Sequence, residues 1–255
     1  AQETRRRARI RRIGFIAVAL VLLLCVAGAV GGFTYYTSLD GKLSLKDSDA
    51  KTALTLPDEN EPYYTVVFAD VTDPTLASGE ASYALALVRT DEQNQQVTLI
   101  SIPTNVRVTL SDGEVHRIVD AYELSGDAAL IKAVSSFTGV PISHYVKTDA
   151  TGISRMVSEL GDLTVQVNEE VDDPKAGADY IPAGSQTLGD AAILTLLRAN
   201  NFQDALERMS QNQQTVLSAF SLALLDKDAL SLCQFIDASD GAFGCDVSLP
   251  TVLSM

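Results

Sequence analysis

The sequence is poor in the residues that build metal and thiol sites: it has three cysteines, two histidines and no tryptophan among 255 residues. No Cys-x-x-Cys or Cys-x-x-His pairing is present, which excludes a structural zinc site of the common kind. His116 and His144 stand alone in the sequence, without a cysteine or carboxylate motif beside them. We therefore expect both histidines to have ordinary structural roles.

Basic residues are also scarce, with 19 Lys and Arg against 33 Asp and Glu, and a formal net charge of −14. Six of the basic residues, all Arg, and one Glu lie in the first twelve positions, so the remainder carries a formal charge of −19. A surface this acidic disfavours nucleic acid. The basic head is therefore not a DNA-binding arm.

Residues 13–33 form a run of 21 residues without a charged side chain, long enough to cross a bilayer as a helix. The arginines before the run place the N-terminus in the cytoplasm and the domain outside. A cleaved signal peptide is the alternative, but its apolar region usually has about 7–15 residues. We expect a cytoplasmic basic N-terminus at 1–12, one transmembrane helix at 13–33 and a polar extracytoplasmic stalk at 34–61.

Cys233 and Cys245 fall in the part of the chain that this topology places outside the membrane. An oxidising exterior favours a disulfide between them, and two thiols are the competing interpretation. Their spacing alone does not decide between the two.

Strand and helix patterns alternate beyond residue 61. Residues 63–70 and 83–89 are apolar strand runs, and residues 96–102 are mostly apolar on both faces, which predicts a central strand covered on both sides. Because only a short turn separates 83–89 from 96–102, these two runs should pair as an antiparallel hairpin. We therefore expect an α/β fold with a central mixed β-sheet flanked by helices, preceded by the transmembrane helix.

The remaining patterns complete the expected domain at 62–228 and a C-terminal helix and tail at 229–255. We expect strands or extended segments at 106–110, 115–118, 140–147 and 163–167, and a loop-rich segment at 172–188. Helices are predicted at 126–137 after a Ser125 cap, 151–160, 190–198, from an Asp204 cap to residue 225, and near 229–235.

Several of these segments are familiar in their order: VVFAD, ASYALALVR, QVTLISIPTNV, HRIVDAYELSG, IPAGSQTLGDAAILTLLRAN and LERMSQNQQ. With an N-terminal anchor, the chain resembles the LytR-CpsA-Psr family of bacterial cell-envelope proteins over residues 63–225. The resemblance implies a domain outside the cell membrane that binds a polyprenyl-pyrophosphate carrier in an apolar pocket. It also implies transfer of the carried glycopolymer to peptidoglycan with a divalent metal ion such as Mg²⁺.

Matching positions in this sequence give the candidate site residues. The resemblance implies a metal ligand at Asp70 and catalytic, phosphate-binding guanidinium groups at Arg198 and Arg208. The full ligand-binding set that it implies is Thr104, Asn105, Arg117, Arg198, Arg208 and Gln213. Three surface salt bridges in an acidic domain are the alternative interpretation of the three arginines.

Charged residues that family members usually have are missing at several of these positions. Ala81 and Tyr83 stand where members have an Arg and a metal-binding Asp, and Thr104 and Asn105 replace an Arg-Asp pair. Two further Arg positions hold Asn200 and Gln211. Since phosphoryl transfer depends mainly on positioning and charge neutralisation, we predict weak or lost transferase activity and weak or absent use of Mg²⁺.

The predicted function is therefore that of a pseudoenzyme of cell-wall biogenesis that retains lipid binding. The expected partners are a polyprenyl-phosphate-linked glycopolymer, peptidoglycan and the membrane, with no nucleic acid. Two alternatives stay open. One is an active transferase in which Arg89 and Arg107 compensate for the missing charges, and the other is a non-enzymatic interaction module of the envelope.

Overall fold

The computed structural model describes residues 35, 37–42, 45, 48–57, 61–76 and 81–246. The chain divides into two units, and the larger one begins at Lys42. The transmembrane helix predicted at 13–33 lies outside the described residues. Among the helices that are described, none combines the length and the apolar character that crossing a membrane requires.

A mixed five-stranded sheet forms the centre of the larger unit, as predicted. Its strand order is β3-β2-β1-β6-β9. The β1–β6 pair is parallel and the other three pairs are antiparallel, including the predicted β2–β3 hairpin. The strands are β1 (Tyr63–Asp70), β2 (Tyr83–Asp91), β3 (Gln96–Ser101), β6 (His144–Asp149) and β9 (Phe243–Cys245).

The prediction that residues 96–102 form a central, doubly covered strand is wrong. β3 lies at the edge of the sheet, and Val97 is 71% exposed. β-Branched side chains favour an extended backbone at an edge as well as in the centre, so the run of Val, Leu and Ile did not reveal the position of the strand.

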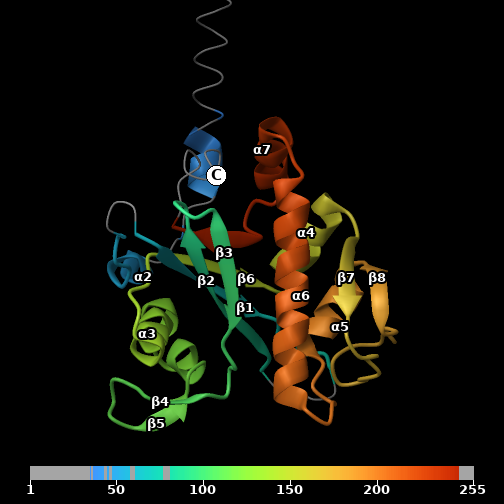
Figure 1. Ribbon diagram of the computed structural model, residues 1–255, viewed down its shortest axis with the longest axis horizontal. Coiled ribbons are helices and arrows are strands. Elements are labelled where there is room, and N and C mark those ends of the chain that lie inside the picture. Colours follow the sequence, from blue (N-terminus) through green and yellow to red (C-terminus); the bar gives the residue numbers. More distant parts are fainter. Residues whose placement is uncertain are drawn as a thin grey trace, which may run out of the picture. The chain divides into compact units, whose positions relative to one another are not determined.

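Helices cover both faces of the sheet, and two small hairpins complete the fold. Figure 1 shows α2 and α3 on one side and α4, α5 and α6 on the other. The helices are α2 (Ser48–Thr52), α3 (Asp120–Thr138), α4 (Ala150–Leu160), α5 (Asp190–Arg198), α6 (Ala205–Leu225) and α7 (Ala229–Ala238). The hairpins pair β4 (Arg107–Thr109) with β5 (Val115–Arg117), and β7 (Leu163–Val167) with β8 (Gly184–Leu188).

Some local predictions are corrected by the structure. α3 begins at Asp120, and Ser125 and Gly126 form a kink within it, so Ser125 is not its cap. Gly139 ends the helix as predicted, with a φ of 73° that glycine adopts without steric cost. Asp204 precedes α6 but its side chain makes no capping hydrogen bond. β8 and β9 were missed because one is polar and the other has only three residues.

The C-terminal segment is fixed to β6 by a carboxylate. Asp246 Oδ1 accepts a hydrogen bond from the backbone N–H of Tyr145 at 2.7 Å, and Oδ2 lies 2.8 Å from His144 Nδ1. His116 Nε2 likewise lies 2.9 Å from Asp112 Oδ2, so neither histidine stands alone in the folded chain. Cys233 and Cys245 are not joined to each other by a disulfide.

The two faces of the sheet differ in the size of their side chains. β1 and β2 direct Phe68, Tyr83 and Leu85 into the core beneath α3. On the opposite face, under α6, the same strands carry Ala84, Ala86 and other small or medium residues. Since successive strand residues point to opposite faces, the alternation of Ala and Leu in the sequence Tyr-Ala-Leu-Ala-Leu creates this difference.

A half-buried ion pair joins β6 to α3 and makes stability depend on pH. Lys147 Nζ lies 3.0 Å from Asp127 Oδ1, which also accepts a hydrogen bond from the Tyr145 hydroxyl at 2.9 Å. Burial opposes the charge of Lys147, but its interactions with Asp127 and Tyr122 outweigh this and raise its pKa. A base with a raised pKa stabilises the fold fully below its unfolded pKa, about 10.4, and loses that contribution as pH rises through the folded pKa.

We therefore expect the free energy of unfolding of the unmodified protein to fall more steeply above about pH 10.4 than that of Lys147→Met. Urea unfolding at a series of pH values measures this difference. Lys132→Met removes an exposed lysine of α3 and serves as the matched control. Parallel pH profiles for the unmodified protein and Lys147→Met would contradict the expectation.

Candidate functional site

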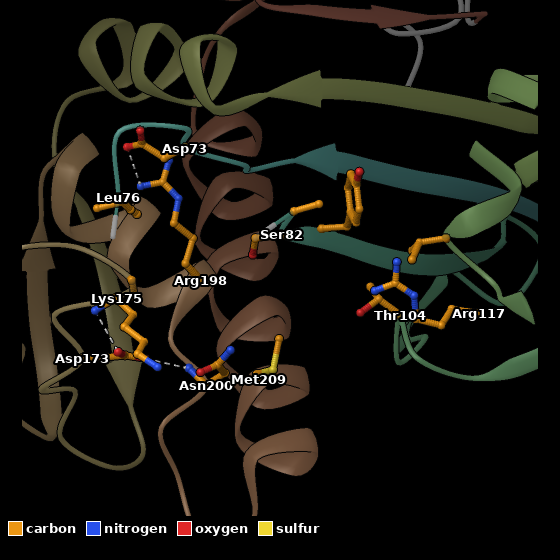
Figure 2. A pocket seen from close by; sticks show the side chains of 14 residues that line it. Asp73, Leu76, Ser82, Thr104, Arg117, Asp173, Lys175, Arg198, Asn200 and Met209 are labelled. Carbon is orange, nitrogen blue, oxygen red and sulfur yellow. Dashed lines mark hydrogen bonds and ion pairs between the residues drawn. The ribbon is translucent and has the colours of Figure 1, made fainter. Parts of the chain in front are cut away.

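A polar cleft lies where the loops after β1, β3 and β5 meet the C-terminal end of α5 and the first turns of α6. Its volume is about 140 Å³. Figure 2 shows its labelled side chains, with Arg198 on one side and Thr104 and Arg117 on the opposite side. The charged residues of its lining are Asp73, Arg117, Asp173, Lys175 and Arg198. The lining thus holds three cations and two carboxylates in an otherwise acidic chain.

Arg198 is placed by the helix that it ends. The buried leucines of α5, among them Leu196 and Leu197, fix the helix against the core and bring Arg198 to the cleft. Its Nε donates a hydrogen bond to the Val71 carbonyl at 2.6 Å, and Nη1 lies 3.5 Å from Asp73 Oδ2. The side chain is only 9% exposed, and burial lowers its pKa while Asp73 opposes that shift. An arginine keeps its charge in proteins, so a fixed cation stands at this end of the cleft.

Arg117 lies at the end of β5 and is held by a carboxylate of α3. Its Nε donates to Asp120 Oδ1 at 2.8 Å, and its backbone N–H donates to Asp120 Oδ2 at 2.8 Å. The hydrogen bond to Asp120 raises the pKa of Arg117, with burial opposing. Arg117 is therefore a positioned cation whose charge is already partly neutralised.

The other predicted ligand residues do not line the cleft. Arg208 Nε lies 2.8 Å from Glu169 Oε2, and Nη1 donates to Gln211 Oε1 at 2.9 Å. Asn105 is exposed, and Gln213 is buried and lines an apolar cavity under α6 instead. The structure thus brings together Arg198, Arg117 and Thr104 from the predicted set.

Asp173 and Lys175 line the cleft, although the sequence did not mark them as site residues. The Asp173 carboxylate accepts hydrogen bonds from the backbone N–H groups of Lys175 and Asn200, both at 3.1 Å. It therefore fixes the loop after β7 to the end of α5. Lys175 is exposed and has no ion pair among the described residues. The Asp-Pro-Lys sequence looks like an ordinary turn, which gave no signal of this role.

The donors near Asp70 do not fit a magnesium site. Asp70 Oδ1 accepts a hydrogen bond from the Thr72 N–H at 3.1 Å, and its cross-strand neighbour is Tyr83 rather than a second carboxylate. The Tyr83 hydroxyl donates to Glu123 at 2.8 Å, and burial together with this contact raises its pKa. Among the described residues no group of three or more His, Cys, Asp or Glu is placed to hold a metal ion.

An apolar cavity lies on the α6 side of the sheet. Its volume is about 220 Å³, and almost all of its wall is apolar. Ala84 and Leu197 line the cavity, while their chain neighbours Tyr83 and Arg198 line the cleft. The Gln213 amide, in the cavity wall, lies 3.4 Å from the Tyr83 carbonyl. The remaining wall residues are Val67, Ala69, Leu85, Ala86, Val146, Thr148, Ile153, Met156, Val216, Leu217, Phe220, Leu224, Phe235 and Phe243.

Comparison with known proteins matches the chain to a family and to individual relatives. The model of the LytR_cpsA_psr family matches residues 36–255. The chain is 25% identical over 237 residues to the polyisoprenyl-teichoic acid–peptidoglycan teichoic acid transferase TagV of Bacillus subtilis, covering 84% of this chain and 60% of TagV. It is 23% identical to TagU of Enterococcus faecalis, named as the same kind of transferase, covering 79% of this chain and 77% of TagU.

Solved structures share the fold. B. subtilis TagV superposes with a TM-score of 0.64 at 20% identity, over 77% of this chain and 78% of TagV. The LytR-Csp2A-Psr enzyme of Actinomyces oris gives a TM-score of 0.61 at 21% identity, with 79% of each chain covered. The structure of TagT bound to LI-WTA gives 0.60 at 19% identity, over 83% of this chain and 80% of TagT.

Proposed function

Because the chain belongs to the LytR_cpsA_psr family, we propose that it binds a polyprenyl-(pyro)phosphate-linked glycopolymer and has weak or lost capacity to transfer that polymer to peptidoglycan. The proposal includes anchoring by residues 13–33, with the domain outside the cell membrane. One observation carries the binding part: consecutive residues line the two sites, with Tyr83 and Arg198 in the cation-bearing cleft and Ala84 and Leu197 in the apolar cavity. A ligand with an apolar tail and a phosphate head has the chemistry of these two sites.

Tail burial supplies the affinity in this proposal. Burying about 200 Å² of isoprenoid surface would contribute about 5 kcal/mol. The phosphate head would lie against Arg198 and Lys175, since charge-assisted hydrogen bonds to phosphate are the strong ones. The relatives TagV and TagU are named as acting on polyisoprenyl-teichoic acid and peptidoglycan, which supports this ligand class.

Weak transfer follows from the pairing of the cleft arginines with carboxylates of the protein. Arg198 faces Asp73 and Arg117 is held by Asp120, so each arginine already has a carboxylate within 4 Å. A single catalytic arginine is worth roughly a thousandfold or more in phosphoryl transfer. Tyr83, Thr104 and Asn200 line the same cleft without charge at neutral pH. The cleft is therefore better suited to holding a phosphate than to stabilising its transfer.

The two alternatives fit the structure less well. Arg89 pairs with Asp91, Arg107 is exposed on β4, and neither lines the cleft, so they do not compensate for the missing charges there. Lys175 is the better candidate for such compensation. A non-enzymatic module with a filled core is disfavoured because the apolar cavity is open.

Blocking the apolar cavity should weaken lipid binding without affecting the binding of a soluble phosphate. We expect Ala84→Phe to weaken binding of a polyprenyl pyrophosphate at least tenfold, about 1.4 kcal/mol, because the ring would occupy the space of the tail. Fluorescence polarisation of a labelled polyprenyl pyrophosphate, titrated with the full chain in detergent, measures the affinity. Binding of inorganic pyrophosphate should not change.

Val97→Phe enlarges an exposed residue of β3 and is the matched control. Absence of lipid binding by the unmodified protein, with or without added Mg²⁺, would overturn the binding part of the proposal. Efficient transfer from a lipid-linked glycan to peptidoglycan would overturn the part that concerns weak activity.

A further inference from the structure

An exposed apolar patch lies where α6 ends and α7 begins. This leucine patch consists of Leu222 and Leu225, one turn apart on α6, and Leu230 in the first turn of α7, which are 68%, 76% and 67% exposed. Figure 1 shows α7 next to the C-terminal end of α6. We propose that the leucine patch inserts into the surface of the membrane, as a second contact besides the anchor of the function proposed above, on which this inference rests.

The grouping of these leucines distinguishes them from other exposed apolar residues. Among the described residues, five large apolar side chains are at least two thirds exposed, and three of the five form the leucine patch. Single exposed apolar residues are ordinary on protein surfaces, whereas grouped ones mark contacts with a partner or a membrane. The leucine patch therefore needs an occupant that covers it.

The path of the chain brings a membrane to this part of the domain. Lys42 Nζ lies 2.6 Å from Asp237 Oδ1 on α7, and the Leu45 backbone N–H donates to the Cys245 carbonyl on β9 at 2.8 Å. Only eight residues, 34–41, separate Lys42 from the uncharged run at 13–33. Since eight residues span at most about 30 Å, a run that crosses the membrane keeps α7 within reach of the bilayer surface.

The two helices that carry the leucine patch also line the apolar cavity. Leu224 of α6 and Phe235 of α7 belong to the cavity wall, while Leu225, the next residue of α6, is exposed. A domain that touches the bilayer through these helices would bring that wall toward the lipid phase, from which a polyprenyl carrier has to be extracted. A membrane contact here therefore suits the proposed binding of a lipid-linked ligand.

Burial of hydrocarbon rather than charge would drive this contact. The turn between the two helices holds one lysine, Lys227, between the carboxylates of Asp226 and Asp228, and Asp237 farther along α7 pairs with Lys42. Such a rim offers no basic cluster to anionic head groups, unlike the polar face of many amphipathic helices. We therefore expect equal insertion into phosphatidylcholine vesicles with and without phosphatidylglycerol.

The absence of tryptophan from the sequence allows a direct test with the full chain in vesicles. Leu225→Trp introduces a single fluorophore at the leucine patch, and lipids brominated on their acyl chains quench a tryptophan that enters the hydrocarbon. Because an inserted apolar face lies about 5–10 Å deep, we expect brominated vesicles to lower the emission at least about twofold. Leu124→Trp, at an exposed position of α3, is the matched control and should keep its emission.

Two further variants keep the result decisive. Leu230→Trp reports on the same patch should Leu225→Trp fail to fold. Adding Leu222→Asp and Leu230→Asp to Leu225→Trp should abolish the quenching, because two carboxylates would have to enter the hydrocarbon. Quenching that survives both carboxylates would show that tethering alone brings the helix to the bilayer, and it would overturn the proposal.

Flotation of the chain with the vesicles is measured in parallel and tests the anchor. A chain that floats while Leu225→Trp stays unquenched, or equal quenching of Leu124→Trp, overturns the insertion of the leucine patch and leaves the proposed anchor supported. A blue-shifted but unquenched emission overturns it too, since a second copy of the chain or residues 247–255 would then cover the leucines. A chain that does not float contradicts the proposed anchoring as well, whereas titration with polyprenyl pyrophosphate judges ligand binding separately.

Discussion

Replacement of Arg198 by alanine is expected to weaken binding of a polyprenyl pyrophosphate about ten- to a hundredfold. Charge-assisted hydrogen bonds are worth about 1.5–3 kcal/mol each, and Arg198 is the most buried cation of the polar cleft. The change also removes the donor to the Val71 carbonyl, so we expect the free energy of unfolding to fall by about 1–3 kcal/mol. Lipid titration and urea unfolding measure the two effects.

Arg89→Ala is the matched control, because it removes the same charge from a residue that pairs with Asp91 outside the cleft. The lipid affinity of Arg89→Ala should stay within about twofold of that of the unmodified protein, because a charge outside the cleft contributes little to binding there. Arg198→Lys should be intermediate, since lysine keeps the charge without the planar fork. Unchanged affinity of a folded Arg198→Ala protein would show that the cleft does not hold the phosphate.

Replacement of Tyr83 by aspartate, the residue that the family resemblance implies at this position, is expected to destabilise the protein by about 3–5 kcal/mol. The ring is buried and packs against Phe68, with centroids 5.7 Å apart, and against Tyr122 at 6.2 Å. A carboxylate at this position would also lie across from Asp70, its neighbour on β1. Denaturant unfolding measures the loss.

Tyr83→Phe separates the two contributions. It removes only the hydroxyl that donates to Glu123, so we expect a loss of about 1 kcal/mol. A Tyr83→Asp protein that is as stable as the unmodified protein and binds Mg²⁺ would contradict our expectation that the packing of the buried ring stabilises the fold. If the expectation holds, a single substitution cannot place an acidic residue at position 83 without a loss of stability.

Much of the fold could be predicted from local patterns. The β2–β3 hairpin follows from two strand runs and a short turn, and α5 and β7 begin and end where the sequence placed them. The edge position of β3 could not be predicted, because strand order depends on contacts between distant segments. The apolar cavity had a signal that was missed: alternating Ala and Leu in β2 leaves one face of the strand without bulk.

The residues of the cleft could be predicted from the sequence only where they stand at the ends of regular helices or strands. Arg198 and Arg117 end regular elements, and both of these motif-matched residues line the same cleft. Arg208 follows the helical period instead: successive residues of α6 point about 100° apart, and its neighbour Met209 reaches the cleft while Arg208 reaches Glu169. The position of Lys175 depends on the path of a loop, which local sequence patterns do not predict.

One helix, α6, forms part of the wall of both the polar cleft and the apolar cavity. If a ligand in one of these sites displaced α6, the affinity of the other site would change, and thermodynamic reciprocity would make the coupling free energy equal in both directions. A lipid tail that held the helix against the sheet would then also change the affinity of the cleft for the phosphate head.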